Sequence, residues 1–249
     1  MKRVLVVGGA NGIGLALATE LAGRETCERI YIVDKAEVAE EFMNDKFMSY
    51  VFDLSEGDYS FFDRFTDIDA MMITAGFGRL ALFEDLDEQY IIRSMMVNSV
   101  SVMRLIRRFY DRINSTEDFR CGVMVSIAGF MSSPFFSVYG ASKAALKIFI
   151  ESVNVELEKA GVSNRILNVS PGSIKGTSFS NGKTDLSQTS VLAEQIICHL
   201  EAKSDLFIPQ YEEVYKEVLF RYQKDFRAEG RHSYDYKLGS GRVTGLVKK

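Results

Sequence analysis

Residues 4–14 read V-L-V-V-G-G-A-N-G-I-G, and this stretch decides the fold. Four apolar residues, three of them β-branched, predict a short buried strand that stops at the glycines. Ile13, Leu17 and Leu21 then recur with helical spacing, so a helix should follow the turn and end near Gly23. A strand, a glycine-rich turn and a helix in this order predict the first unit of a parallel sheet.

The glycines of this turn have the spacing of a phosphate-binding loop. Gly8, Gly12 and Gly14 form the pattern G-x-x-x-G-x-G. Positions without a side chain let the backbone approach a pyrophosphate, and the N-terminus of the following helix presents unpaired N–H groups and a positive dipole. We therefore predict a dinucleotide cofactor at this turn, with Asn11 and Ile13 among its contacts.

An acidic residue supports this interpretation and bears on the choice of cofactor. Asp34 follows Gly14 by twenty residues and ends the second predicted strand, where its carboxylate can accept hydrogen bonds from the adenosine ribose. The same carboxylate would repel a 2′-phosphate, so NAD is preferred to NADP. Lys35 is adjacent and keeps NADP open as the alternative. Asp53 has two interpretations, a bond to the adenine amino group or a cap for a helix starting near Ser55.

The rest of the chain continues the alternation of strands and helices. Further strands are predicted at residues 30–33, 48–52, 70–73, 122–127, 165–169 and 206–208, and further helices at 87–113, 137–159, 191–200 and 211–226. This pattern predicts an α/β fold, with a doubly wound, Rossmann-like parallel sheet and helices on both faces, in a single domain over residues 1–249. Residues 1–177 should form its core.

The remaining residues, 178–249, should provide a substrate loop, the last strand and a C-terminal helical extension. Residues 173–190 are rich in Ser, Gly, Thr and Asn and are expected to form a loop. From Arg231 onward the apolar periodicity is too weak to place an element.

Composition excludes several classes of protein. The chain has 249 residues and a net charge of -4, which argues against a nucleic-acid partner. Cys27, Cys121 and Cys198 form neither a disulfide framework nor a C-x-x-C pair, which fits a reducing, cytoplasmic location. Two isolated histidines are too few for a zinc site, so we expect no metal. We also expect no signal peptide and no membrane span.

A tyrosine and a lysine share one face of the helix that opens with S-V-Y-G-A-S-K at residues 137–143. Tyr139 and Lys143 lie four positions apart; taken alone, the tyrosine would bury its ring while the lysine reaches water. Beside nicotinamide, the pair gains a role, because hydride transfer at a carbinol carbon needs a group that moves the hydroxyl proton. A free phenol has a pKa of about 10. A nearby ammonium and the positive nicotinamide ring would lower this pKa.

Several further motifs point the same way. The chain has T-A-G at residues 74–76, Ser126 thirteen residues before Tyr139, and P-G-S-I-K-G-T at 171–177. Together with G-G-A-N-G-I-G, Asp34, Asn98 and Y-G-A-S-K, they resemble the short-chain dehydrogenase/reductase family from Lys2 to about Thr177. The resemblance implies an NAD(P)-dependent oxidoreductase that interconverts an alcohol and a carbonyl.

The resemblance also implies roles for individual residues. Tyr139 would be the general acid/base and Ser126 would hold the substrate oxygen. Lys143 would bind the nicotinamide ribose and tune Tyr139, and Asn98 would help to place a water that relays protons from Lys143. Further cofactor contacts would come from Ala75, Gly76, Pro171, Gly172, Ile174 and Thr177. The sequence departs from the family at Val7, often Thr, and at Thr74, often Asn, and we expect small losses from both.

The substrate is predicted only as a small alcohol or carbonyl compound. Met131, Phe135, Phe136 and Phe179 would form an apolar wall, with few charges beyond Lys175 and Lys183. This composition favours, slightly, a hydrophobic or neutral substrate over a sugar phosphate or polyacid.

Assembly and a rival function complete the expectations. The family commonly forms homodimers or homotetramers through two long helices. In this chain the surface could come from Met95, Met96, Met103, Leu105, Ile106, Leu146, Ile150 and Val153, which could equally be core. The extension after the last strand could cover the active site or mediate assembly. The alternative function is a non-catalytic NAD(P)-binding sensor or scaffold, for which a proton pathway through Ser126, Tyr139, Lys143 and Asn98 would be unnecessary.

Overall fold

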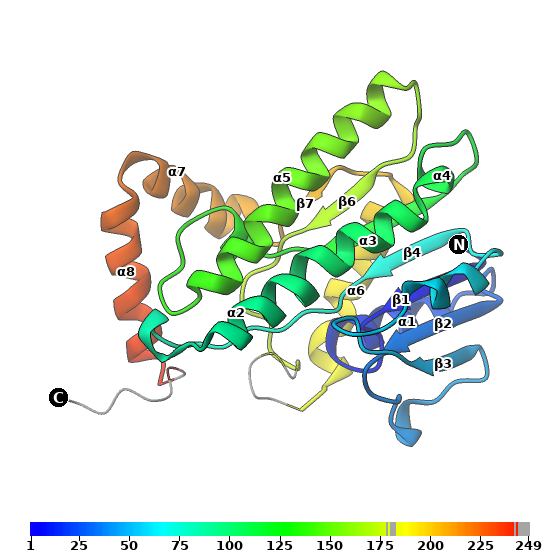
Figure 1. The fold of residues 1–249 in the computed structure, drawn as a ribbon, viewed down its shortest axis with the longest axis horizontal. Coiled ribbons are helices and arrows are strands. Elements are labelled where there is room, and N and C mark those ends of the chain that lie inside the picture. The colour runs from blue at the N-terminus through cyan, green and yellow to red at the C-terminus, as the bar shows by residue number, and fades with distance from the viewer. Residues whose placement is uncertain (178, 180–182, 242, 244–249) are drawn as a thin grey trace.

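A seven-stranded parallel sheet forms the centre of the molecule (Figure 1). The computed structural model describes residues 1–177, 179, 183–241 and 243. The strands are β1 (Arg3–Val7), β2 (Arg29–Asp34), β3 (Phe47–Val51), β4 (Ala70–Ile73), β5 (Arg120–Met124), β6 (Ile166–Val169) and β7 (Leu206–Phe207). Their order is β3-β2-β1-β4-β5-β6-β7, so the winding reverses between β1 and β4. Ligands bind at such a switch point, outside the carboxyl ends of the strands.

The first strand shows why its sequence is apolar without alternation. Leu5 and Val7 belong to the hydrophobic core on one face of the sheet, and Val4 and Val6 to the core on the other face. Because both faces are covered, neither set of side chains can be polar. This confirms the predicted doubly wound α/β sheet with helices on both faces.

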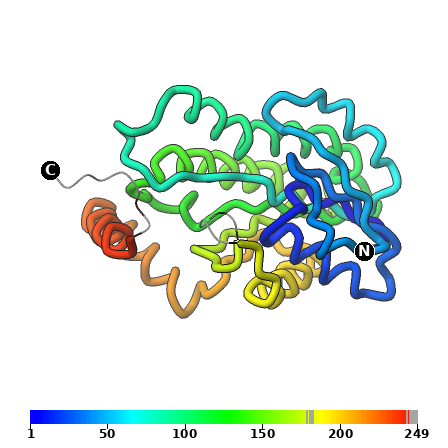
Figure 2. Tube along the Cα trace, turned by 90° about the horizontal axis from the view of Figure 1, so that it is seen from below, coloured from blue at the N-terminus to red at the C-terminus, as the bar shows by residue number. Residues whose placement is uncertain are grey.

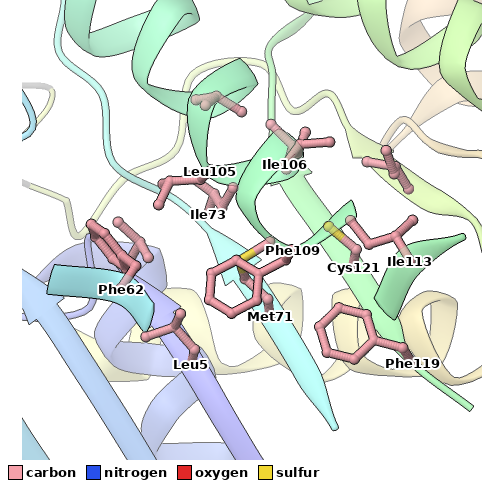
Figure 3. Packing of buried hydrophobic residues seen from close by; sticks show 14 of the residues in the cluster. Leu5, Phe62, Met71, Ile73, Leu105, Ile106, Phe109, Ile113, Phe119 and Cys121 are labelled. Atoms are coloured by element: carbon pink, nitrogen blue, oxygen red, sulfur yellow. The ribbon is translucent and has the colours of Figure 1, made fainter. Parts of the chain in front are cut away.

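Helices cover the sheet on both sides (Figure 1). They are α1 (Gly12–Ala22), α2 (Glu88–Met95), α3 (Ser101–Arg108), α4 (Tyr110–Ile113), α5 (Ser137–Lys159), α6 (Leu186–Glu201), α7 (Lys216–Lys224) and α8 (Phe226–Gly239). α1 and α6 pack together over one face, while α3 and α5 lie over the other. Figure 3 shows Leu105 and Ile106 of α3 in the same hydrophobic core as Ile73, Met71 and Cys121 of the sheet.

Two predicted elements differ from the structure in the first half. The helix predicted over residues 87–113 is interrupted by a π-helical turn at Met96–Val100. The helix predicted near Ser55 is wrong, because Asp53 accepts hydrogen bonds from the backbone and hydroxyl of Ser55 and closes only a turn. A short 3-10 helix follows at Tyr59–Arg64, and Asp58 caps it.

The second half departs further from the predictions. α6 begins at Leu186, so the predicted loop over residues 173–190 ends earlier; residues 178 and 180–182 of that loop lie outside the described part of the chain. The helix predicted over residues 211–226 is confirmed to within two residues, since the chain is helical from Tyr211 to Lys224. A π-helical turn at Tyr211–Tyr215 leads into α7, and Asp225, in extended conformation, ends α7 and caps α8.

We call residues 211–241 the C-terminal arm. The arm lies at the end of the molecule opposite the N-terminal strands (Figures 1 and 2). The sequence did not place α8, and residues 242 and 244–249, which the prediction included in the extension, lie outside the described residues.

Most of the residues considered for an assembly surface are core residues. Leu105, Ile106, Leu146, Ile150 and Val153 are buried within the chain. The exposed apolar side chains of the same helices are Ile92, Val100, Ile148 and Val155. Among the described residues, no helix combines the length and apolarity needed to span a bilayer.

Candidate active site

A cavity of about 1220 Å³ opens at the carboxyl ends of the central strands. It extends from the glycine turn and Asp34, past Ala75 and Gly76, to Ser126 and Tyr139. All the predicted catalytic and cofactor-contacting residues line it except Asn98 and Lys143, which lie buried behind its wall. Residues distant in sequence therefore meet at the switch point of the sheet, where the fold was expected to bind its ligand.

The glycine turn is held against the end of β4. Gly8 has a φ of 89°, and a Cβ there would overlap the backbone of Ala75, so only glycine fits. The Thr74 hydroxyl donates to the Gly8 carbonyl at 2.8 Å, which confirms that this residue still provides one hydroxyl bond. At the start of α1, the Gly12 N–H donates to the Thr184 hydroxyl at 3.1 Å. These contacts fix the turn in the shape of an anion-binding loop.

Asp34 supports the turn as well as facing the cavity. One carboxylate oxygen accepts the Ala10 N–H at 3.0 Å, and the other accepts the Ala36 N–H at 3.3 Å. Asp53 also lines the cavity, and its bonds from the Ser55 hydroxyl and N–H hold the pKa of its carboxyl below the usual range. A carboxylate can accept further bonds, so both acids remain able to contact a nucleoside.

Asn98 lies in the π-helical turn and is fully buried. Its side-chain oxygen accepts the Phe77 N–H at 2.9 Å and its amide donates to the Phe77 carbonyl at 2.9 Å. The amide also donates to the hydroxyls of Ser94 and Ser142. Its side chain therefore fixes the segment after Gly76 to α5, a role that the sequence did not suggest.

Ser126 and Tyr139 approach each other at the wall of the cavity. The Ser126 oxygen accepts the Ala128 N–H at 3.1 Å, which orients the hydroxyl. Hydrogen bonding from Ser126 acts to lower the pKa of Tyr139, but burial outweighs it and raises that pKa to about 12. The groups of the protein alone therefore do not lower the pKa of the phenol, and the lowering expected from Lys143 together with the nicotinamide ring stays a prediction.

Lys143 lies behind the tyrosine. Its ammonium donates to the Met124 carbonyl at 2.8 Å and lies 5.8 Å from the centre of the Tyr139 ring. Complete burial lowers the pKa of Lys143 to about 7. Desolvation thus favours the neutral form of both groups.

The expected apolar wall is only partly correct. The rings of Phe136 and Phe179 each lie 5.2 Å from that of Tyr139, and Met131 also lines the cavity. Phe135 does not line it; its ring packs at a tilt against that of Tyr234 of α8, with the ring centres 4.4 Å apart. Its φ of 66° is unusual for a bulky residue and marks local backbone strain.

The expectation of few charges at the cavity is wrong. Lys175 and Lys183 do not line it, whereas the C-terminal arm contributes Arg221, Glu229 and Lys237. Sequence patterns missed these residues because they belong to two exposed helices without a functional motif. The aromatic and charged character of residues 211–226 was the available signal, and it suggested only a cover or an assembly surface.

The arm crosses from one side of the cavity to the other. The Tyr215 hydroxyl occupies the space that a side chain at Gly172 would take, so the two residues are in close contact. Lys237 donates to the Ser133 hydroxyl at 2.6 Å and to the Pro134 carbonyl at 2.8 Å. The arm therefore joins the Pro171–Gly172 segment to the loop before α5.

The residues present fit a dinucleotide. Glycine leaves the turn without side chains, the N-terminus of α1 faces the cavity, and Asp34 lies where a ribose would bind. The cavity exceeds the roughly 300–1,000 Å³ of an ordinary small-molecule site, which leaves room for a substrate as well. Within the described residues, no cluster of three or more His, Cys, Asp or Glu could hold a metal ion.

Comparisons with known proteins agree with this geometry. The chain is 27% identical over 190 residues to 11-beta-hydroxysteroid dehydrogenase 1A of Arabidopsis thaliana, covering 70% of this chain and 52% of the relative. A short chain dehydrogenase from Burkholderia cenocepacia, solved with NADP, has a TM-score of 0.76 at 20% identity and covers 94% and 99% of the two chains. A relative from Burkholderia phymatum, solved with NAD, has a TM-score of 0.75 at 16% identity, covering 92% and 95%.

These structural likenesses show the shared fold. The chain spans about half the length of the plant relative. The model of the family described as short chain dehydrogenase matches residues 2–187, which includes the glycine turn, Ser126, Tyr139 and Lys143. The chain therefore belongs to the short-chain dehydrogenase family.

Proposed function

We propose that the protein is an NAD(P)-dependent oxidoreductase that interconverts an alcohol and a carbonyl compound. The observation that carries the proposal is the meeting of Ser126 and Tyr139 at one wall of a cavity that begins at a dinucleotide-type turn. Nicotinamide, when bound, supplies the hydride acceptor or donor. The residues of the chain then have to position the substrate and move one proton.

Tyr139, which lines the cavity, is the proposed general acid/base. In oxidation it takes the proton of the substrate hydroxyl, and in reduction it returns a proton to the carbonyl oxygen. Ser126, oriented by the Ala128 N–H, holds the same substrate oxygen by a hydrogen bond. The positive charge of oxidised nicotinamide would favour phenolate and oppose the desolvation that raises the pKa of Tyr139 to about 12.

Lys143 and Asn98 are proposed to act from behind the wall. The Lys143 ammonium lies beside Gly76, where a Cβ would be 3.3 Å from it, and it can turn from the Met124 carbonyl to a ribose hydroxyl. The side-chain amide of Asn98 is committed to Phe77, so any help that it gives to a proton-relaying water comes through its backbone. Both residues would thus help to hold the cofactor in its part of the site.

We propose NAD as the preferred cofactor, because the Asp34 carboxylate would repel a 2′-phosphate. Lys35 also lines the cavity and would attract that phosphate, so the preference is a balance of two neighbouring charges. The remaining proposed cofactor contacts are Ala75, Gly76, Pro171, Gly172, Ile174 and Thr177. Thr177 is buried against Gly12, which links the second half of this site to the glycine turn.

We also propose a reducing, cytoplasmic setting and a homo-oligomer. Cys27 and Cys121 are free thiols, and burial raises the pKa of both, to about 12 for Cys121. Thiols held in this protonated form are poor nucleophiles, so they suit packing and not redox chemistry. The exposed side chains of Ile92, Val100, Ile148 and Val155 offer apolar contacts to a second copy.

The Tyr139→Phe variant tests the proposed function against the sensor or scaffold alternative. General acid/base catalysis contributes roughly 10²- to 10⁴-fold, so turnover of a panel of alcohols and ketones, followed by nicotinamide absorbance, should fall by that factor. Cofactor affinity, measured by fluorescence, should stay within about threefold, since the ring is retained. Tyr110→Phe is the matched control, because Tyr110 lies outside the cavity. Equal turnover in the Tyr139 variant would remove this residue from the mechanism.

A further inference from the structure

Two charged side chains are buried among the residues that the structure describes, Lys143 and Glu229. Lys143 already has a place in the proposed reaction. Glu229 lies in the first turn of α8 and lines the same cavity. An acid favours the first turn of a helix, but an exposed acid serves this purpose equally well. Burying a carboxylate costs free energy, and a well-packed apolar residue often joins two helices as well. Stability alone therefore does not account for Glu229.

Arg221 holds the Glu229 carboxylate without saturating it. Its Nε and Nη2 donate to the two carboxylate oxygens at 2.7 and 3.3 Å. The described residues make no other hydrogen bond to this carboxylate, so about two of its roughly four lone-pair positions stay open. Arg221 is itself fixed, because its Nη1 donates to Glu217 at 2.9 Å. Glu229 is thus an acceptor in a fixed position at the cavity wall, with capacity for a further donor.

The face of α8 that lines the cavity is polar. Its members besides Glu229 include His232, Ser233 and Tyr236. Their spacing of three or four residues places them on one side of the helix. Polar groups at the wall of a cavity have to be hydrogen-bonded to water or to a ligand, because leaving them without a partner costs free energy. A fully apolar substrate would therefore suit this half of the cavity poorly.

The loop before α5 connects this polar face to the proposed acid/base. A Cβ on Gly230 would lie 3.5 Å from the Ser132 hydroxyl, so the first part of α8 packs against this loop. Four residues after Ser132, the Phe136 ring lies 5.2 Å from that of Tyr139. A substrate that lies along Phe136 can thus have its reacting carbon at Tyr139 and its other end at Glu229.

From this arrangement we infer that Glu229 selects the substrate by accepting a hydrogen bond from a hydroxyl or amino group remote from the reacting carbon. The substrate is then a carbonyl compound or alcohol with an apolar body and a donor group at its far end. The inference rests on the proposed oxidoreductase function and adds a polar group to the hydrophobic or neutral substrate expected from the sequence. A site built to bond a donor rejects an analogue without it, because part of the buried acceptor then stays unpaired.

Ketones of matched size test this choice. 4-(Hydroxymethyl)acetophenone and 4-(aminomethyl)acetophenone carry a donor that 4-ethylacetophenone lacks, and the same three groups on 4-acetylbiphenyl test a longer distance from the carbonyl. At one of the two lengths, we expect the full-length protein to reduce a donor ketone with a kcat/KM about tenfold or more above that for the ethyl compound. The better of the two donors identifies the group that the site binds.

Glu229→Gln should lose most of this preference through KM. Its amide oxygen still accepts from Arg221, but its NH2 group offers the substrate a donor in place of an acceptor. Glu217→Gln is the matched control and should keep the preference, because Glu217 bonds the same guanidinium but is exposed and does not line the cavity.

Activity on the ethyl ketones shows whether the site of each variant is intact. If Glu229 only joins α7 to α8, its replacement changes kcat/KM for the donor and ethyl ketones by the same factor. That result, or a parent chain without a preference for a donor at either length, would overturn the inference and leave the oxidoreductase function in place.

Calorimetry with the same ketones, with oxidised NAD or NADP present, gives a readout that needs no turnover. We expect a donor ketone to bind the parent chain and to bind Glu229→Gln about tenfold more weakly. Such binding without reduction of any ketone in the activity assay would support the donor site and count against the proposed reaction. Equal affinities in the two proteins, or binding of no donor ketone, would overturn the inference.

Discussion

The glycine turn and the C-terminal arm face the same cavity, but different forces hold them. The turn joins two buried elements, β1 and α1, and its shape depends on backbone contacts with β4 that leave no room for a side chain. The arm consists of two largely exposed helices whose contacts with the body of the protein are aromatic and charged.

This difference determines how each region responds to change. A backbone held by close packing tolerates few substitutions, whereas side-chain contacts between an exposed helix and a loop can be exchanged at small cost. The glycine turn should therefore tolerate fewer substitutions than the arm. The following predictions test this contrast, starting with the largest effect.

The same substitution should have opposite effects in the two regions. Gly8→Ala places a methyl group against the Ala75 backbone at a left-handed φ, and should lower the free energy of unfolding by about 4 kcal/mol or more. Gly239→Ala, at the end of α8 with open space around it, should raise it by up to about 1 kcal/mol. Urea denaturation measures both. A Gly8 variant that loses less than about 1 kcal/mol would contradict the packing argument.

Lys143→Met tests the cost of burying an ammonium beside the cofactor site. The pKa of Lys143 is lowered to about 7 in the folded chain, so between pH 7 and its ordinary value the unfolded chain binds more protons. The buried charge is therefore a penalty below pH 7 that disappears as the pH rises through this window. At pH 6 the variant, which lacks this penalty, should therefore have an advantage over the parent chain in the free energy of unfolding. This advantage should shrink by on the order of 3 kcal/mol between pH 6 and pH 10.

Parallel denaturation series at these two pH values give the difference directly. Lys147→Met is a control, since Lys147 lies one turn along α5 and pairs with Glu151 at the surface. A difference between Lys143→Met and the parent that does not change with pH would show that Lys143 stays charged in the fold.

Asp34→Asn isolates the charge that is expected to select the cofactor. An asparagine oxygen can still accept the Ala10 N–H, so the turn should keep its shape. The ratio of NADPH to NADH affinity should rise about tenfold, which corresponds to about 1.4 kcal/mol. Lys35→Gln should shift the ratio in the opposite direction. If the parent chain already prefers NADPH, Lys35 outweighs Asp34.

The smallest effect is expected in the arm. Tyr234→Leu removes the ring that packs against Phe135 and should lower stability by about 1 kcal/mol. Hydrogen exchange should become faster in residues 131–136, because α8 restrains this loop. Tyr211→Leu, an exposed residue of the same arm, should change neither measurement. Unchanged exchange in the Tyr234 variant would mean that the loop holds its own conformation.

The sequence predicted most of the first region because local signals there agree with the tertiary structure. The apolar run of β1, the glycine spacing and the Tyr139–Lys143 interval each encode geometry directly, and the sheet order follows from the alternation of strands and helices. The predicted residues that line the cavity are brought together by the fold, as expected.

The arm could not be predicted in the same way. The helix breaks at Asp225 because the side chain of this residue caps α8. Such a cap competes with continuation of α7, and the apolar periodicity alone does not show whether the cap or the continued helix prevails. The pKa directions of Tyr139 and Lys143 depend on burial, which a local motif does not contain. Lys237 reaches the cavity only because α8 folds back onto the loop before α5.

The π-helical turn at Met96–Val100 inserts one extra residue into an otherwise regular helix. Each residue of an α-helix advances the chain by about 100° around the axis, so removing one residue here would rotate the two halves relative to each other by that angle. Either Asn98 would leave Phe77, or Leu105 and Ile106 would leave the sheet. A one-residue deletion in this turn should thus be far more harmful than a conservative replacement at any of its positions, which makes chain length in this segment as restrictive as residue identity.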